Sequence, residues 1–182
     1  MSRWTRHVKE WKTCTRCPLH KTRTKVVLAK GYIPCDVLFI GEAPGPSEDV
    51  IGSPFVGPAG ILLDKIIEAA AKNWEEEQGE LRKAFTNLIA CIPLDPEGVG
   101  KFSEPPAESI KACAPRILEF VSICKPRLIV HVGKLAAEHT TYTEEEQIHI
   151  THPAAILRTD VGRKGLMLQT AIVTLRDALE EL

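Results

Sequence analysis

Residues 35–60 read CDVLFIGEAPGPSEDVIGSPFVGPAG. An apolar run leads into a long segment rich in glycine and proline, and a helical pattern begins at about Gly60. A short, continuously apolar run is typical of a strand that is covered on both faces of its sheet. The stretch therefore predicts a strand over residues 35–41 that ends in a stiff loop.

The rest of the chain repeats this alternation of apolar strand-like runs and helix-period patterns. Further strands are predicted over residues 85–92, 127–133 and 147–151, and helices over residues 60–72, 104–121, 134–139 and 166–182. Such a pattern indicates an α/β fold, in which the chemistry lies in loops beyond the carboxyl ends of the strands. Those loops are residues 42–57, 87–93, 133–136 and 152–158.

Composition limits the class of protein. The chain has 182 residues, of which 44% are hydrophobic and 26% charged, which is enough for a buried core and excludes fibrous and disordered classes. No apolar run approaches the ~20 residues of a membrane span, and the first thirty residues lack the apolar middle of a signal peptide. We expect one domain over residues 1–182, no membrane partner and a cytoplasmic, nucleoid-associated location.

Charge is distributed unevenly along the chain. The formal net charge is −1, yet nine Lys or Arg residues fall within residues 1–30, against the single acid Glu10. A basic, helical amino-terminal arm on an acidic body indicates a polyanion partner held through phosphate contacts, or equally a solvated basic helix with nothing bound. The nine cations are Arg3, Arg6, Lys9, Lys12, Arg16, Lys21, Arg23, Lys25 and Lys30.

Six cysteines in an intracellular chain favour metal ligands or buried apolar groups over disulfides. Cys14 and Cys17 form a C-x2-C pair in a basic context, and Cys91 and Cys113 supply a second pair. Four thiolates suit a tetrahedral zinc or an iron–sulfur cluster, and spacing alone does not separate the two. The alternative is an unmetallated pair with the other two in the core. Both remaining cysteines, 35 and 124, lie in apolar runs and are expected to be buried.

The loop after the first strand contains neither a dinucleotide fingerprint nor a Walker motif. Its carboxylates include Glu42 and Glu48, and its one aromatic residue is Phe55. A lone Phe in a Gly/Pro loop is either a hydrophobic plug or a platform on which a base stacks.

The segment after the last strand, residues 148–165, reads IHITHPAAILRTDVGRKG. His152 stands at the predicted strand end. Apolar Ile156 and Leu157 are followed by Arg158, with further cations at positions 163 and 164. Apolar tips flanked by cations suit a wedge that enters a base stack while the cations hold phosphates.

Together, these motifs resemble the uracil-DNA glycosylase superfamily, specifically its family 4 branch. After C-x2-C come GEAPGPSED, G-x-PFVG-x-AG-x-LLD, TN-x3-C-x-P and HPAAILR, in this order over residues 14–158. The resemblance implies a three-layer α/β/α fold around a four-stranded parallel sheet. It also implies a structural [4Fe–4S] cluster on the four cysteines, with zinc the less favoured alternative.

The resemblance further implies a monofunctional enzyme that flips uracil out of DNA and hydrolyses its N-glycosidic bond, leaving an abasic site. Phe55 would stack on the base and Asn87 would read its edge, because an amide pairs with both O4 and N3–H of uracil. His152 would stabilise the departing uracil anion. Backbone amides of Glu42 to Gly45, those of Ala43 and Gly45 among them, would share that work.

For the remaining roles, Ile156 and Leu157 would fill the vacated gap in the DNA, with Arg158 beside them. The best-known branch of the superfamily has an Asp where this chain has Ala43. The carboxylate that positions water or stabilises the sugar cation is therefore expected to be Glu42, with Glu48 as the other candidate.

The chain departs from the family pattern chiefly in residues 92–109, IPLDPEGVGKFSEPPAES, which are longer and lack an Arg after the cysteine. Ala154 also stands where Ser is common. Two other functions therefore stay open: a non-catalytic module that docks on DNA or a partner, and a glycosylase for another deaminated base such as hypoxanthine. We expect a monomer whose partner is uracil-containing DNA.

Overall fold

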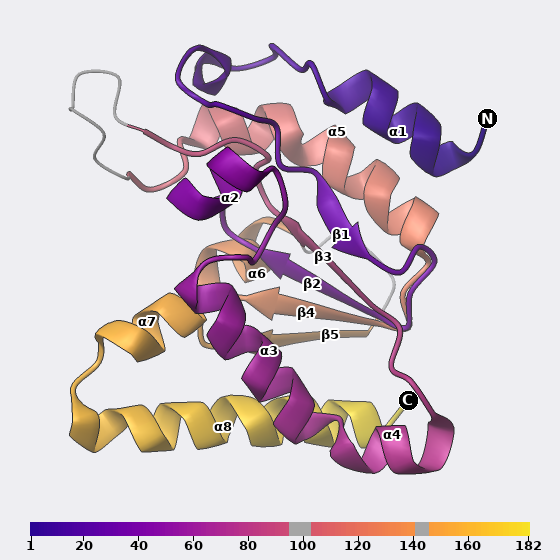
Figure 1. Ribbon diagram of the computed structural model, residues 1–182, viewed down its shortest axis with the longest axis vertical. Coiled ribbons are helices and arrows are strands. Elements are labelled where there is room, and N and C mark those ends of the chain that lie inside the picture. The colour runs from indigo at the N-terminus through magenta and orange to yellow at the C-terminus, as the bar shows by residue number, and fades with distance from the viewer. Residues whose placement is uncertain (95–102, 141–145) are drawn as a thin grey trace.

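A sheet with strand order β1-β3-β2-β4-β5 forms the centre of the molecule (Figure 1). The computed structural model describes residues 1–94, 103–140 and 146–182. β3, β2, β4 and β5 are parallel, which confirms the predicted parallel sheet, and β1 adds an antiparallel edge that the sequence did not predict. The strands are β1 (Ala29–Gly31), β2 (Val37–Gly41), β3 (Lys83–Asn87), β4 (Leu128–Val132) and β5 (Glu146–Ile150).

Helices cover both faces of this sheet and give three layers, α/β/α (Figure 1). α1 and α5 lie on one face, and α3 and α8 lie on the other. The helices are α1 (Arg3–Trp11), α2 (Pro46–Ile51), α3 (Pro58–Ala70), α4 (Lys72–Gln78), α5 (Ala107–Cys124), α6 (Lys134–His139), α7 (Pro153–Arg158) and α8 (Val161–Glu180), with a 3-10 turn at Pro18–Lys21.

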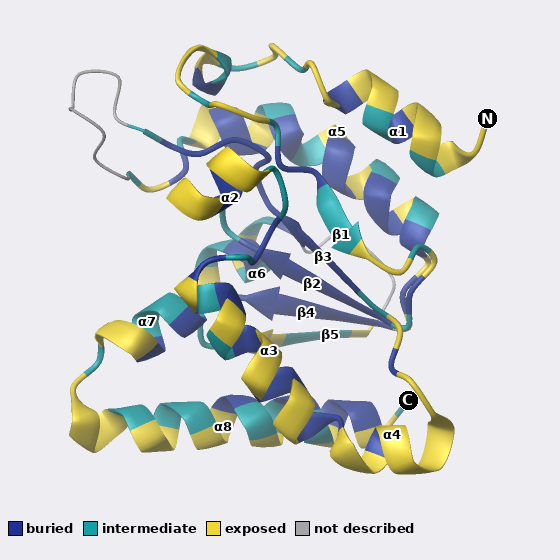
Figure 2. Ribbon diagram, in the orientation of Figure 1, coloured by how far each residue is buried: buried dark blue, intermediate teal, exposed yellow. Residues whose placement is uncertain are grey.

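The central strand β2 shows why its sequence is continuously apolar. Val37 and Phe39 pack into the core cluster with α3 and α8, whereas Leu38 and Ile40 pack into the cluster with α5. All four side chains are 0% exposed, and β2 and β4 are dark along their whole length in Figure 2. Burial of each such side chain contributes about 1.5–3 kcal/mol, so the strand is held from both sides.

Several predicted boundaries are wrong. β3 ends at Asn87 rather than at residue 92, because the chain then turns so that the Leu88 and Ile89 amides donate to the carbonyls of Gly41 and Glu42. Residues 153–158 form helix α7 rather than a loop, and α8 begins at Val161 rather than at residue 166. Of the atypical segment after Cys91, residues 95–102 lie outside the described ranges.

The basic arm is helical only in part, over α1 and the 3-10 turn. Two buried side chains of α1 attach it to α5, where His7 Nδ1 and Trp11 Nε1 each lie 2.8 Å from a carboxylate oxygen of Glu119. Over the described ranges, no helix is both long and apolar enough to cross a membrane.

Candidate active site

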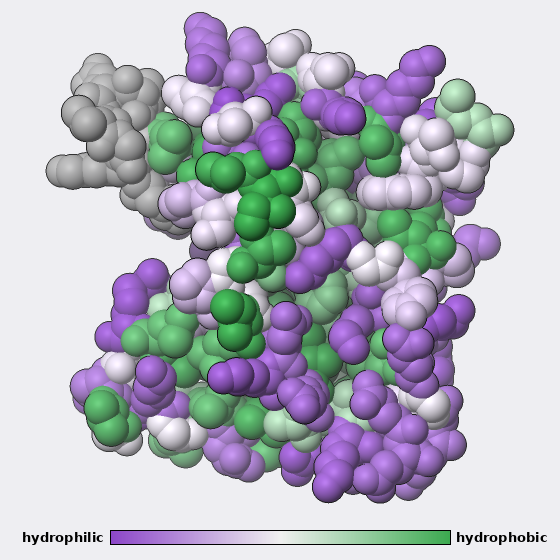
Figure 3. Space-filling view, viewed as in Figure 1, coloured by the Kyte–Doolittle hydropathy of each residue, from purple (hydrophilic) through white to green (hydrophobic). Residues whose placement is uncertain are grey.

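A cleft of about 570 Å³ crosses the carboxyl ends of the four parallel strands. Glu42 follows β2, Asn87 ends β3, Gly133 follows β4 and His152 follows β5, and all four line the cleft. Figure 3 shows the molecule hollowed on this side, between the α2 region and α7. Parallel sheets bind ligands at this edge, so the predicted loops do meet in one site.

Gly133 brings Glu42 and His152 together. A Cβ at this position would lie 2.4 Å from Glu42 Oε1 and 3.2 Å from His152 Cδ2, and the φ of +105° is one that side chains rarely adopt. Glycine is therefore required for the carboxylate and the imidazole to approach one another. Sequence reasoning did not single out this glycine, although its place directly after a buried strand is a usable signal.

His152 is held as a neutral imidazole with a defined tautomer. Its Nδ1 accepts the backbone N–H of Ala154 at 3.1 Å, as the N-cap of α7. Burial, and to a smaller extent the charge of Arg158, lowers the pKa of His152 to about 4. With Nδ1 engaged as an acceptor, the proton of the neutral ring resides on Nε2, which is left as a donor.

Glu42 is half-buried, and its burial raises the pKa of the carboxyl. A hydrogen bond from the Leu135 backbone and the charge of Arg158 oppose that rise, while the charge of Glu104 adds to it. The neighbouring groups thus offset only part of the free-energy cost of burying the negative charge of Glu42. A carboxylate in that state is suited to accept a hydrogen bond from a bound water.

Phe55 and Asn87 converge at the end of β2. A Cβ on Gly41 would lie 2.5 Å from both the Asn87 Oδ1 and the Phe55 Cζ, so the amide and the ring occupy the space that this glycine leaves. Both side chains are largely buried, at 3% and 6% exposure. The Asn87 backbone carbonyl is in turn held by the guanidinium of Arg116, a buried α5 residue that the sequence did not point to.

Phe55 adopts an unusual backbone conformation, with a φ of +53°. Few residues other than glycine enter this left-handed region, and a bulky side chain there indicates strain that the surroundings must maintain. The ring packs at 5.8 Å from the ring of Phe85 beneath it. Phe55 therefore presents a fixed aromatic face at the floor of the cleft.

Glu48 is committed to the loop itself. Its Oε1 accepts the amides of Val56 and Gly57, at 2.9 and 2.8 Å, and its Oε2 accepts the amide of Gly45, at 3.1 Å. Three backbone donors occupy this carboxylate, which leaves it poorly suited to the predicted catalytic role. The amide of Gly45 is occupied as well, so its predicted donation to a ligand is corrected. Of the two amides named in the prediction, that of Ala43 remains a candidate.

The predicted apolar wedge is wrong for Ile156. In α7, Pro153 and Ile156 stand one turn apart on the face toward the core, and Ile156 is 0% exposed. Leu157 is 39% exposed beside it. Arg158 is exposed and lines the cleft. The predicted exposed apolar residue next to a cation is therefore Leu157, beside Arg158.

All four predicted ligand cysteines line one small cavity, which lies between α1, the loop after β3 and α5. Cys14 and Cys17 come from the segment after α1, Cys91 follows β3 and Cys113 lies on α5. Within the described ranges, no three His, Cys, Asp or Glu side chains have the geometry to hold a single metal ion. The two remaining cysteines, 35 and 124, are buried elsewhere in the core, as predicted.

The surroundings of this cavity fit an anionic group. An Arg23 N–H donates to the Cys91 sulfur at 3.3 Å and lowers the pKa of that thiol, which opposes the rise caused by burial. Arg116 also lines the cavity, is 1% exposed, and its Nε has no hydrogen-bond partner among the described residues. A buried cation with an unsatisfied N–H is costly unless negative charge adjoins it, and a tetrathiolate centre supplies that charge.

The chain belongs to the uracil DNA glycosylase superfamily, because the model of that family matches residues 30–176. Within it, the curated relatives are type-4 uracil-DNA glycosylases, which confirms the resemblance seen in the motifs. The protein of Pyrobaculum aerophilum is 35% identical over 127 residues, and that of Archaeoglobus fulgidus is 32% identical over 131 residues. These matches cover 70% and 72% of this chain, but 59% and 60% of the relatives.

The type-4 enzyme of Thermotoga maritima is 32% identical over 140 residues, which are 77% of this chain and 66% of that protein. The chain thus spans about two thirds or less of the length of these relatives. Among solved structures, the NMR structure of a candidate uracil DNA glycosylase from Methanosarcina acetivorans matches with a TM-score of 0.50. It is 12% identical, and the match covers 84% of this chain and 95% of the other, which supports the fold alone.

Proposed function

We propose that the protein is a monofunctional DNA repair glycosylase that removes uracil by base flipping and leaves an abasic site. The observation that carries the proposal is the convergence of Phe55, Asn87 and His152 on one cleft. They supply a fixed aromatic face, an amide, and a neutral imidazole whose Nε2–H has no acceptor among the described residues. These are the three groups needed to stack on a pyrimidine, read its edge and stabilise it as a leaving group.

Recognition is assigned to Phe55 and Asn87. The flipped base lies on the Phe55 ring, which offsets part of the few kcal/mol that unstacking costs. The Asn87 amide donates to uracil O4 and accepts from N3–H, whereas cytosine presents an amino group and a bare nitrogen at the same positions. Among the described residues, no hydrogen bond engages this amide within the protein, so it is available to the base.

Bond cleavage is assigned to His152 and Glu42. Scission of the C1′–N1 bond builds positive charge on the sugar and negative charge on uracil. The Nε2–H of the neutral His152 donates to uracil O2 as that charge develops, with the Ala43 amide as a second donor. Glu42, which lies beside His152 across Gly133, holds the attacking water and stabilises the sugar cation. Glu48 keeps the loop in shape.

The DNA strand is held at the α7 side of the cleft. Leu157 fills the space that the base leaves, while Arg158 contacts a phosphate. The partner is uracil-containing DNA bound by a single copy of the chain, which would place the protein on the nucleoid.

The four cysteines, 14, 17, 91 and 113, are proposed to hold a [4Fe–4S] cluster rather than zinc. When bound, such a cluster supplies structural cross-linking of α1, the β3 loop and α5. The choice follows the resemblance to the family 4 branch, and each thiolate of such a cluster binds a different iron atom. Iron and acid-labile sulfide measured on purified protein should give about four of each per chain, and zinc in their place would refute the cluster.

The function is tested on labelled oligonucleotides with one uracil, in single strands and opposite G or A, followed by alkali to break abasic sites. We expect cuts at uracil from the parent protein, none at hypoxanthine, and loss of the discrimination against cytosine in Asn87→Ala. Binding to DNA without cleavage would favour the non-catalytic module. Cuts at hypoxanthine alone would favour the other deaminated base.

A further inference from the structure

The peptide group between Phe55 and Val56 is gripped at both ends by charged side chains. The Nζ of Lys30 donates to the Phe55 carbonyl at 2.9 Å, and a carboxylate oxygen of Glu48 accepts the Val56 N–H at 2.9 Å. Charge-assisted hydrogen bonds of this kind are about twice as strong as neutral ones. The plane of this one peptide is therefore fixed from opposite sides.

That peptide plane sets the direction of the Phe55 ring. Because φ is the rotation about the N–Cα bond, a return of Phe55 from +53° to the favoured negative region would turn its ring and the following peptide together, relative to the preceding peptide. Holding the following peptide therefore also holds the ring. Gly60 in α3 closes the third side, since a Cβ there would lie 2.2 Å from the Phe55 carbonyl oxygen. The strained conformation thus persists through contacts that surround the carbonyl.

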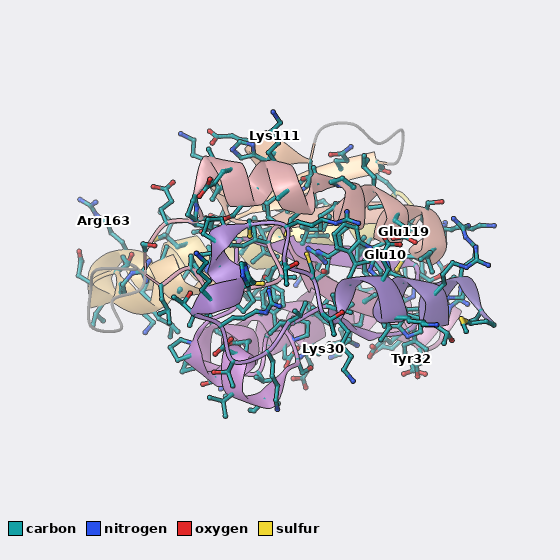
Figure 4. All side chains as sticks on the ribbon, turned by 90° about the horizontal axis from the view of Figure 1, so that it is seen from above. Glu10, Lys30, Tyr32, Lys111, Glu119 and Arg163 are labelled. Atoms are coloured by element: carbon teal, nitrogen blue, oxygen red, sulfur yellow. The ribbon has the colours of Figure 1, made fainter. Side chains whose placement is uncertain are left out.

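The edge strand β1 places Lys30 for this contact. Lys30 pairs with Phe85 of β3, and its Nζ lies 4.9 Å from the centre of the Phe85 ring. No carboxylate among the described residues forms an ion pair with it, so its ammonium is directed to the Phe55 carbonyl and the aromatic ring. The extra strand therefore has a specific task at the cleft. Lys30 is labelled in Figure 4.

We propose that Lys30 is a positioning residue for uracil: together with Glu48 it clamps the Phe55–Val56 peptide and so aims the ring on which the flipped base stacks. This inference rests on the proposed function, in which Phe55 is the stacking platform. It assigns a role to a residue outside the motifs by which the sequence resembles the family.

The test compares Lys30→Met, Lys30→Arg and Lys25→Met with the parent protein. Lys25 is the matched control, because its Nζ also donates to a backbone carbonyl of the same loop, that of Ile51 at 3.3 Å, but does not touch the Phe55–Val56 peptide. For Lys30→Met we expect kcat/KM on uracil oligonucleotides to fall about 10- to 100-fold, and inhibition by free uracil to weaken in parallel. Affinity for uracil-free DNA should equal that of Lys25→Met, and Lys30→Arg should regain part of the loss.

Three results would overturn the clamp. The first is parental kcat/KM in Lys30→Met, and the second is a loss of kcat/KM no larger than that of Lys25→Met. The third is a loss of affinity for uracil-free DNA by the same factor as kcat/KM, which would make Lys30 a phosphate contact. A parent protein that does not cut uracil would refute the proposed function instead. In that case a crystal structure of Lys30→Met still tests the clamp. If the clamp exists, loss of the Lys30 hydrogen bond lets Phe55 return to a negative φ; a φ that stays positive overturns it.

Discussion

At the scale of single residues, His152 links catalysis to pH. Burial lowers its pKa to about 4, so the neutral donor form persists across the physiological range. We expect the rate of excision to be unaffected by His152 ionisation above about pH 5, and to fall as the pH approaches 4, where Nδ1 gains a proton and loses the Ala154 amide. A pH–rate profile on single-stranded uracil substrate measures this. A fall centred near pH 6.5 would contradict it.

The same shift affects folding stability. Because the folded pKa lies below the ordinary value of 6.5, the unfolded chain binds more protons between about pH 4 and 6.5. The contribution of His152, on the order of 3 kcal/mol, is therefore complete above pH 6.5 and is lost as the pH falls toward 4. The control is His152→Gln, which does not titrate. His7 and His131, whose pKa values burial also lowers, remain in both proteins and cancel in the difference.

At the scale of elements, two adjacent residues of helix α7 are expected to have different roles. Ile156 stabilises the fold, and Leu157 contacts the DNA. Ile156 is fully buried against the core, so Ile156→Ala should lower the free energy of unfolding by about 2–4 kcal/mol. Leu157 is 39% exposed, so Leu157→Ala should change stability by less than about 0.5 kcal/mol. Its excision rate should fall more on double strands than on single strands, where no gap in a duplex needs filling.

Urea denaturation and the two excision rates check this pair of variants. An equal loss of rate on both substrates for Leu157→Ala would mean that it does not act as the wedge. Loss of duplex activity in Ile156→Ala without loss of stability would show that Ile156 acts in the wedge, as the sequence predicts.

Elements also show what the sequence can predict. β2 and β4 are continuously apolar because both faces are covered, and that signal is local. Strand β1 has three residues, too few for any pattern, and α7 follows a strand so closely that its apolar residues appeared exposed. Likewise, motifs predicted Phe55 and Asn87 in the cleft. The bond from Lys30 to Phe55 joins positions 25 residues apart, and only the folded chain brings them together.

At the scale of the whole molecule, the basic helix α1 and the cleft lie in different places, so the cations of the chain do not form one surface. The basic helix α1 lies on α5, away from the arrowheads of the parallel strands and hence from the cleft (Figure 1). Five of the nine cations of the arm already form hydrogen bonds within the protein: Arg3 with Ser122, Arg16 with Glu10, Arg23 with Cys91, Lys25 with Ile51 and Lys30 with Phe55. Other cations project into solvent, such as Arg163 at the start of α8 (Figure 4).

This placement predicts which charges bind DNA. Lys134 and Arg158 line the cleft, and each phosphate contact contributes about 0.9 to the slope of log affinity against log salt. Replacing both with Gln should therefore lower that slope by about 2. Replacing Arg6 and Lys9 of α1, which removes the same charge, should leave it unchanged. Binding of an abasic duplex, measured by anisotropy from low to moderate salt, compares the two double variants. A reduced slope in the α1 variant would show that the arm itself lies on the DNA, and would extend the interface across α5.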